Sequence, residues 1–130
     1  MSIRVVWDTS ALLAYVAGDT RAAGLGELLA TVEEGGDVTG VPAVCLVAAY
    51  RGADADQHAK LVELTSDDDG PTVILPLLAA DVAPVAELTR TLPIDQAQAV
   101  TAASRHGALL ATYERPKYAG AVDDDDMLDL

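Results

Sequence analysis

The segment that decides the fold spans residues 3–14 and reads IRVVWDTSALLA. Its first five residues are mostly β-branched or aromatic, which predicts a strand buried on both faces, as in a parallel sheet. Asp8, Thr9 and Ser10 have short polar side chains that cap helices, and an apolar run starts directly after them at Ala11. A strand that leads straight into a helix is the repeating unit of a parallel α/β sheet.

The rest of the chain continues this alternation. Working outward, we expect helices at 11–16 and 21–34, an extended segment at 38–41, helices at 43–51 and 55–64, a strand at 72–75, helices at 79–91 and 95–106, and a strand at 108–112. Pro42 is expected in the first turn of a helix, and Pro84 is expected to bend helix 79–91. The pattern predicts an α/β fold with a parallel sheet.

Length and composition indicate one domain of 1–120 followed by an acidic tail at 121–130, where the composition changes. The net charge is −13, which opposes non-specific binding to a phosphate backbone. Eight of the 21 acids lie in that tail and in the turn at 67–69, so the remaining body is only mildly acidic and RNA is not excluded. It has no basic stripe to hold a strand.

The chain has no Phe and a single cysteine, so we expect an aliphatic core in which Cys45 is a small buried residue. A lone cysteine forms no internal disulfide, and the zinc-site spacings are absent. The N-terminus has no secretory signal pattern, and no apolar run approaches the length of a membrane span. We therefore expect a soluble, cytoplasmic protein with no membrane association.

Three acids are placed where parallel sheets bind ligands, at the carboxyl ends of the strands. Asp8 ends the first strand, Asp95 begins the helix that leads into the last strand, and Glu114 lies two residues beyond that strand. Carboxylates brought together repel one another, and such clusters usually hold a divalent cation of the Mg²⁺ or Mn²⁺ type. The alternatives are ordinary helix caps at Asp8 and Asp95 and a solvated loop acid at Glu114.

Other catalytic patterns are missing from the sequence. It has no GxxxxGK[ST] phosphate loop, no GxGxxG dinucleotide motif and no GxSxG nucleophile turn. Three segments of the sequence, 5–14, 92–100 and 109–114, instead resemble a known family. These segments are similar to the opening strand and helix, the third acidic motif and the final strand of PIN domains, which include the VapC-type toxins.

The resemblance covers Ile3 to about Tyr118 and implies a PIN-like three-layer α/β/α sandwich with a small central parallel sheet. It also implies a metal-dependent endonuclease that cleaves mostly RNA. Two departures stand out: the helix that usually carries a family Glu has Ala48 at the best-matching position, and the last acid is Glu114 where the family has Asp. The resemblance therefore implies three acids that hold at most one weakly bound Mg²⁺ or Mn²⁺ ion.

Two functions remain open from the sequence. In the first, Asp8, Asp95 and Glu114 are the catalytic and metal-binding residues of a weakly active endoribonuclease. The hydroxyl groups of Thr9, Ser10 and Thr112 would support that site by binding its waters or a phosphate oxygen. If the nuclease is damaged at residue 48, Ala48→Glu is expected to improve metal binding. In the second, the domain is catalytically inactive and binds a protein or another ligand.

Partners follow from the same resemblance. An active enzyme would act on single-stranded RNA, and PIN toxins usually form homodimers and are neutralised by an antitoxin. The apolar helix residues Leu12, Leu13 and Val16, with the segment 44–50, would supply a dimer surface; alternatively, both sets belong to the core.

Overall fold

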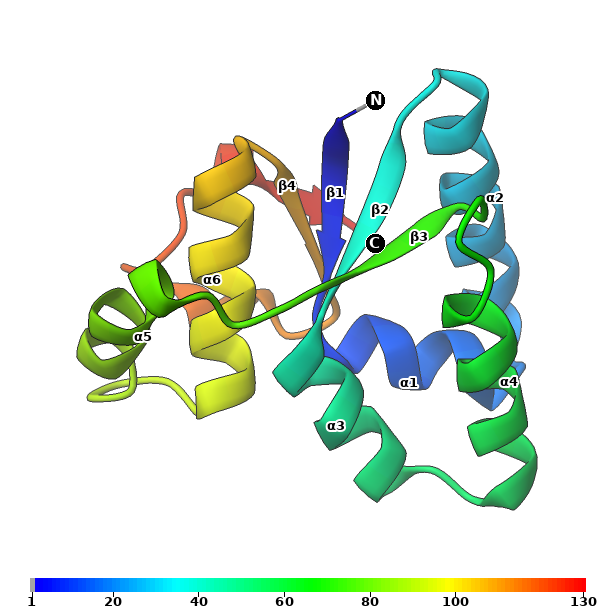
Figure 1. The fold of residues 1–130 in the computed structure, drawn as a ribbon, viewed down its shortest axis with the longest axis horizontal. Helices are drawn as coiled ribbons and strands as arrows, with labels where there is room; N and C mark the ends of the chain where they lie inside the picture. Colours follow the sequence, from blue (N-terminus) through cyan, green and yellow to red (C-terminus); the bar gives the residue numbers. More distant parts are fainter. Residues whose placement is uncertain (1) are drawn as a thin grey trace.

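The computed structural model describes residues 2–130 (Figure 1). The chain forms a five-stranded parallel sheet in the order β3-β2-β1-β4-β5. The strands are β1 (Ile3–Trp7), β2 (Val38–Pro42), β3 (Thr72–Leu75), β4 (Leu109–Thr112) and β5 (Met127–Asp129). The α-helices are α1 (Thr9–Ala17), α2 (Thr20–Glu34), α3 (Ala43–Gly52), α4 (Ala55–Thr65), α5 (Val82–Leu88) and α6 (Ile94–His106).

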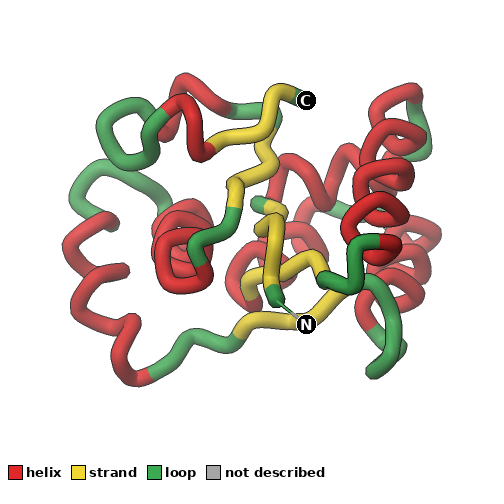
Figure 2. Tube along the Cα trace, turned by 90° about the horizontal axis from the view of Figure 1, so that it is seen from above, coloured by secondary structure: helices red, strands yellow, loops and turns green. Residues whose placement is uncertain are grey.

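Helices cover the sheet on both sides. Helix α6 packs on β1, β2 and β4, with α5 outside it, whereas α2 and α4 lie on the other side of the sheet (Figure 2). Helix α3 contacts both α1 and α6, near the carboxyl ends of the strands (Figure 1). This arrangement confirms the predicted α/β sandwich with a central parallel sheet. In the described residues, no helix combines the length and the apolar character needed to cross a membrane.

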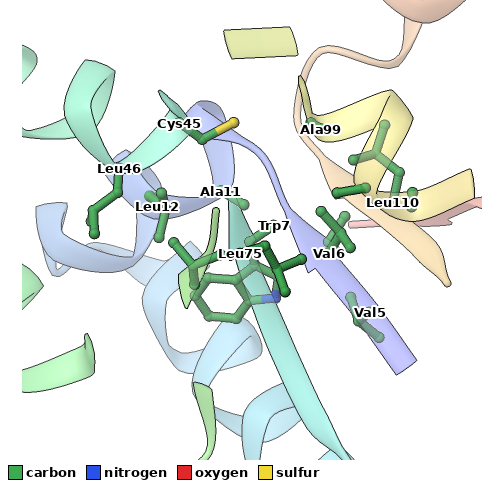
Figure 3. Packing of buried hydrophobic residues seen from close by; sticks show 14 of the residues in the cluster. Val5, Val6, Trp7, Ala11, Leu12, Cys45, Leu46, Leu75, Ala99 and Leu110 are labelled. Carbon is green, nitrogen blue, oxygen red and sulfur yellow. The ribbon is translucent and has the colours of Figure 1, made fainter. Parts of the chain in front are cut away.

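The core is mainly aliphatic, and Trp7 and Tyr118 are its fully buried aromatic residues. Trp7, the last residue of β1, is fully buried, and its ring centroid lies 5.5 Å from that of Tyr15. Leu110 lies on the other face of the sheet, beside Val6 and Ala99 (Figure 3). Cys45 is also fully buried, as the composition predicted. Burial of such side chains, at about 25 cal/mol per Å² of apolar surface, is the main stabilising contribution to a fold of this kind.

Three local predictions differ from the structure. Pro42 is the last residue of β2 and the N-cap of α3, so it lies just before the helix and not in its first turn: its backbone is extended, and it pairs in register with Leu75. The helix expected at 79–91 is a short 3-10 turn (Ala79–Asp81) followed by α5. Asp81 is the last residue of that turn, and its carboxylate accepts a hydrogen bond from the Leu78 N–H at the start of the turn at 2.9 Å and pairs with Arg105.

The third difference concerns the segment 121–130, which composition marked as an acidic tail. Its residues Met127–Asp129 form β5, the strand paired with β4 at one edge of the sheet. Met127 is buried in the core, and its carbonyl accepts a hydrogen bond from Arg115 at 3.1 Å. The strand was not predicted because the preceding acidic run dominates the local composition, while one apolar side chain fixes the strand in place.

Candidate functional site

Asp8 is the N-cap of α1, directly after the central strand β1. Its residue is only 1% exposed. The carboxylate oxygen Oδ1 accepts hydrogen bonds from the Ser10 hydroxyl at 2.6 Å and from the Ala11 N–H at 3.0 Å. These two contacts satisfy the first turn of the helix, which is the ordinary role of a capping aspartate.

The other oxygen of Asp8 is equally occupied. Oδ2 accepts hydrogen bonds from the Thr112 hydroxyl at 2.6 Å and from the Tyr118 hydroxyl at 2.8 Å. An ionised carboxylate offers about four acceptor positions, and four protein donors therefore use them all. Burial, together with the charge of Asp8, raises the pKa of Tyr118 well above its usual value, so this hydroxyl keeps its proton.

The hydroxyl groups that donate to Asp8 are themselves fixed by the backbone after β4. The Ser10 hydroxyl oxygen accepts a hydrogen bond from the Tyr113 N–H, and the Thr112 hydroxyl oxygen accepts one from the Glu114 N–H, both at 2.9 Å. Ser10 and Thr112, two of the three predicted supporting residues, thus link the Asp8 carboxylate to the backbone that follows β4. The result is a closed polar network that joins the ends of β1 and β4 to the start of α1.

Asp95 lies in the first turn of α6 and is half-buried. Its Oδ2 accepts a hydrogen bond from the Thr9 hydroxyl at 2.6 Å, and its backbone carbonyl accepts one from the Cys45 thiol at 3.1 Å. Burial raises the pKa of Cys45, so the thiol remains protonated and acts as a donor and not as a nucleophile.

Glu114 follows β4, and its side chain is 37% exposed. It accepts hydrogen bonds from the Gln96 amide at 2.8 Å and from the Lys117 ammonium at 3.2 Å. Gln96 is buried, and its carbonyl oxygen has no hydrogen-bond partner among the described residues. Neither Gln96 nor Tyr118 was predicted as a site residue.

An open groove of about 730 Å³ joins the two accessible acids. Asp95 and Glu114 line it, whereas Asp8 and Ala48 do not. The groove is also lined by Thr9, Ser10, Leu13, Ala14, Ala17, Arg21, Gly52, Gln57, Pro93, Gln96, Tyr113 and Lys117. The structure thus separates the three acids into one closed centre and one open groove.

The donor set does not fit a divalent metal ion in this arrangement. Within residues 2–130, no three His, Cys, Asp or Glu side chains lie close enough to share an ion. The four protein donors occupy both oxygens of Asp8, and Ala48 has no side-chain oxygen. A Mg²⁺ ion demands near-octahedral oxygen coordination, and two half-exposed acids, one of them paired with Lys117, leave most of that coordination to water.

The comparisons with known proteins concern the fold. No protein-family model matches the chain, and no curated protein matches it significantly. Among solved structures, it is similar to the crystal structure of PAE2754 from Pyrobaculum aerophilum, a PIN-domain protein. The TM-score is 0.57, with 21% sequence identity over 96% of this chain and 93% of that chain. Together with the sheet order, this similarity makes the fold PIN-like.

Proposed function

We propose that this PIN-like domain is catalytically inactive as a metal-dependent nuclease and acts as a binding module through the groove beside Asp95 and Glu114. One observation carries the proposal: four protein donors fill both oxygens of Asp8. The missing acid at Ala48 supports the same conclusion, because it removes a second charged ligand from the same end of the sheet.

A metal ion at Asp8 would have to displace at least one of these donors. The Tyr118 hydroxyl is fully buried, so its loss of Asp8 would leave a polar group without a partner. Such a group costs about 1–3 kcal/mol. An ion with few anionic ligands to compensate would bind weakly, and water activation needs a firmly held ion.

The groove itself has chemistry suited to a polar ligand. It presents the carboxylates of Asp95 and Glu114 beside the cations Arg21 and Lys117. Arg21 is held by Asp19 at 2.8 Å, and its guanidinium lies 5.2 Å from the centre of the Tyr113 ring. A surface with both signs of charge favours a ligand or protein segment that carries both donors and acceptors over a uniformly anionic nucleic-acid backbone.

The second candidate is the weakly active endoribonuclease with a Mg²⁺ or Mn²⁺ ion, single-stranded RNA as substrate and an antitoxin as partner. The placement of Asp95 and Glu114 on one groove favours it. In that case these two acids, with the Thr9 hydroxyl beside Asp95, would form the accessible part of the site. Asp8 would hold α1 in position and would contact no substrate.

The test is cleavage of single-stranded RNA with Mn²⁺ by the wild-type chain and by Asp95→Asn and Glu114→Gln. These variants change groove acids and leave the Asp8 network intact, whereas Asp8→Asn would disturb the fold. We expect the three proteins, purified in parallel, to show the same background. Cleavage by the wild type that falls at least tenfold in both variants would establish the nuclease and refute the binding-module proposal.

A further inference from the structure

Strand β3 forms an open edge of the sheet. It pairs in parallel with β2 through residues 72–75 and has no neighbouring strand on its other side in the described sheet. Figure 2 shows β3 and the segment after it along the outer margin of the molecule. An edge strand offers a row of N–H and C=O groups that can pair with another strand.

The side chains on this edge are apolar and exposed on both faces. Val73 is 40% exposed and Ile74 is 42% exposed. Successive residues of a strand point to opposite faces, so neither helical layer fully covers the middle of β3. Leu77, Leu78 and Val82, in the segment that follows the strand, are also exposed apolar side chains. We call these five residues the β3 edge patch. A helix docked on one face of the sheet would cover either Val73 or Ile74. A strand paired with β3 extends the sheet and brings its own side chains beside both.

The charges of the chain distinguish its two sheet edges. Residues 71–80 contain no charged side chain, although the whole chain has a net charge of −13. The other edge strand, β5, ends at Asp129 and follows the acidic run 124–126, and such charges protect an edge from pairing. Strand β3 is short and lies between Pro71 and Pro76, but it carries no such charge. Two acidic chains can therefore meet along it without bringing charged side chains of the strand together.

We propose that two copies of this chain associate through their β3 edges, antiparallel about a two-fold axis, so that one sheet continues into the other. The interface is self-complementary, as a two-fold contact requires, because an uncharged apolar strand meets its own copy. An antiparallel arrangement also places the acidic turns at 67–69 at opposite ends of the joint, whereas a parallel one would bring them together. A charged partner strand would find no opposite charge within 71–80.

This surface differs from the one expected from the sequence. Leu12 and Val16 of α1 are buried in the core and are not available to a partner. On α3, Val47 is 60% exposed and provides a matched control outside the β3 edge patch. The inference is independent of the proposed function, because β3 supplies no residue to the groove beside Asp95.

The first test is sedimentation equilibrium of the wild type, Ile74→Lys and Val47→Lys at two salt concentrations. We expect the wild type and Val47→Lys to approach twice the mass of one chain, and Ile74→Lys to weaken association at least about tenfold, since a buried unpaired charge at the joint is strongly unfavourable. High salt should strengthen the dimer by screening repulsion. A monomeric wild type, or equal loss of association in Val47→Lys, would overturn the proposal; circular dichroism checks that each variant folds.

The second test uses disulfide cross-linking in the full chain. Cys45 is buried, so a new surface cysteine is the reactive one. A two-fold axis through an antiparallel pair places one residue opposite its own copy, at a Cα separation that allows a disulfide. We expect Val73→Cys or Ile74→Cys to cross-link under mild oxidation, and Val62→Cys on α4, a more exposed apolar position, to remain uncross-linked. Cross-linking at Val62→Cys alone would contradict the proposal.

Discussion

Two acidic regions at the carboxyl end of the sheet have the same residue chemistry and opposite environments. Asp8 is enclosed, and each of its oxygens accepts two hydrogen bonds from the protein. Asp95 and Glu114 are half-exposed on an open groove, and each keeps acceptor capacity toward it. A carboxylate whose acceptor positions are filled stabilises the fold, and one that is partly open can bind a ligand.

The largest expected effect is on Asp8. Asp8→Asn replaces one acceptor oxygen by an NH₂ group that faces hydroxyl or N–H donors. We expect the free energy of unfolding to fall by about 3 kcal/mol, because several buried donors lose their acceptor at once. Urea unfolding followed by circular dichroism measures it. A change below about 1 kcal/mol would show that the network is not a major support of the fold.

A smaller effect is expected at Tyr118, which donates one of those hydrogen bonds. Tyr118→Phe keeps the ring in the core and removes the hydroxyl, so we expect a loss of about 1.5–2 kcal/mol at neutral pH. Comparing this loss of unfolding free energy with that of Asp8→Asn shows how much of the network's stabilisation depends on the Tyr118 hydroxyl. A loss equal to that of Asp8→Asn would mean that Tyr118 alone accounts for the stabilising role of the aspartate.

The same residue has a pH signature. Its pKa is raised in the folded chain, chiefly by burial and then by the charge of Asp8, above an unfolded value of about 10. The stability associated with the protonated hydroxyl is therefore fully present below about pH 10 and is lost as the pH rises further, because only the unfolded chain ionises there. We expect the wild type to lose stability more steeply above pH 10 than Tyr118→Phe, measured by urea unfolding across that range. Parallel slopes would contradict this assignment.

The smallest effects belong to the open groove. Asp95→Asn and Glu114→Gln each change one half-exposed contact, with Thr9 in the first case and with Gln96 and Lys117 in the second. We expect each variant to change the free energy of unfolding by less than about 1 kcal/mol. Thermal unfolding beside Asp8→Asn provides the measurement. If either groove variant is as unstable as Asp8→Asn, the separation between a closed centre and an open groove is wrong.

Much of the fold is predictable from local patterns. The strands 3–7 and 72–75 are found at their predicted bounds, because their β-branched runs are flanked by turn and cap residues. The capping role of Asp8, one of two alternatives left open by the sequence, is likewise visible in the Asp-Thr-Ser order that precedes α1. Strand β5 was missed because pairing with β4 and burial of Met127 decide it, and neither is a local property.

The candidate site is less predictable for the same reason. The order of Asp8, Asp95 and Glu114 indicates that they share one end of the sheet, and the structure places them there. It does not indicate that Tyr118, 110 residues away along the chain, donates to Asp8. Nor does it indicate that Gln96 turns its amide toward Glu114. Donors that are distant in the sequence decide whether the acceptor positions of a carboxylate are occupied by the protein or free for a ligand. This difference separates a structural acid from a ligand-binding one.

The most direct measurement is calorimetric titration of Mn²⁺ into the wild type and into Ala48→Glu. If the chain is a nuclease damaged at residue 48, the sequence predicts that Ala48→Glu improves metal binding. With Asp8 filled by four donors, we predict no saturable binding at millimolar Mn²⁺ in either protein. One-to-one binding in the wild type, or binding gained in Ala48→Glu and lost again when Asp95→Asn is added, would contradict the conclusion that these acids do not fit a metal ion and would favour the metal-dependent nuclease.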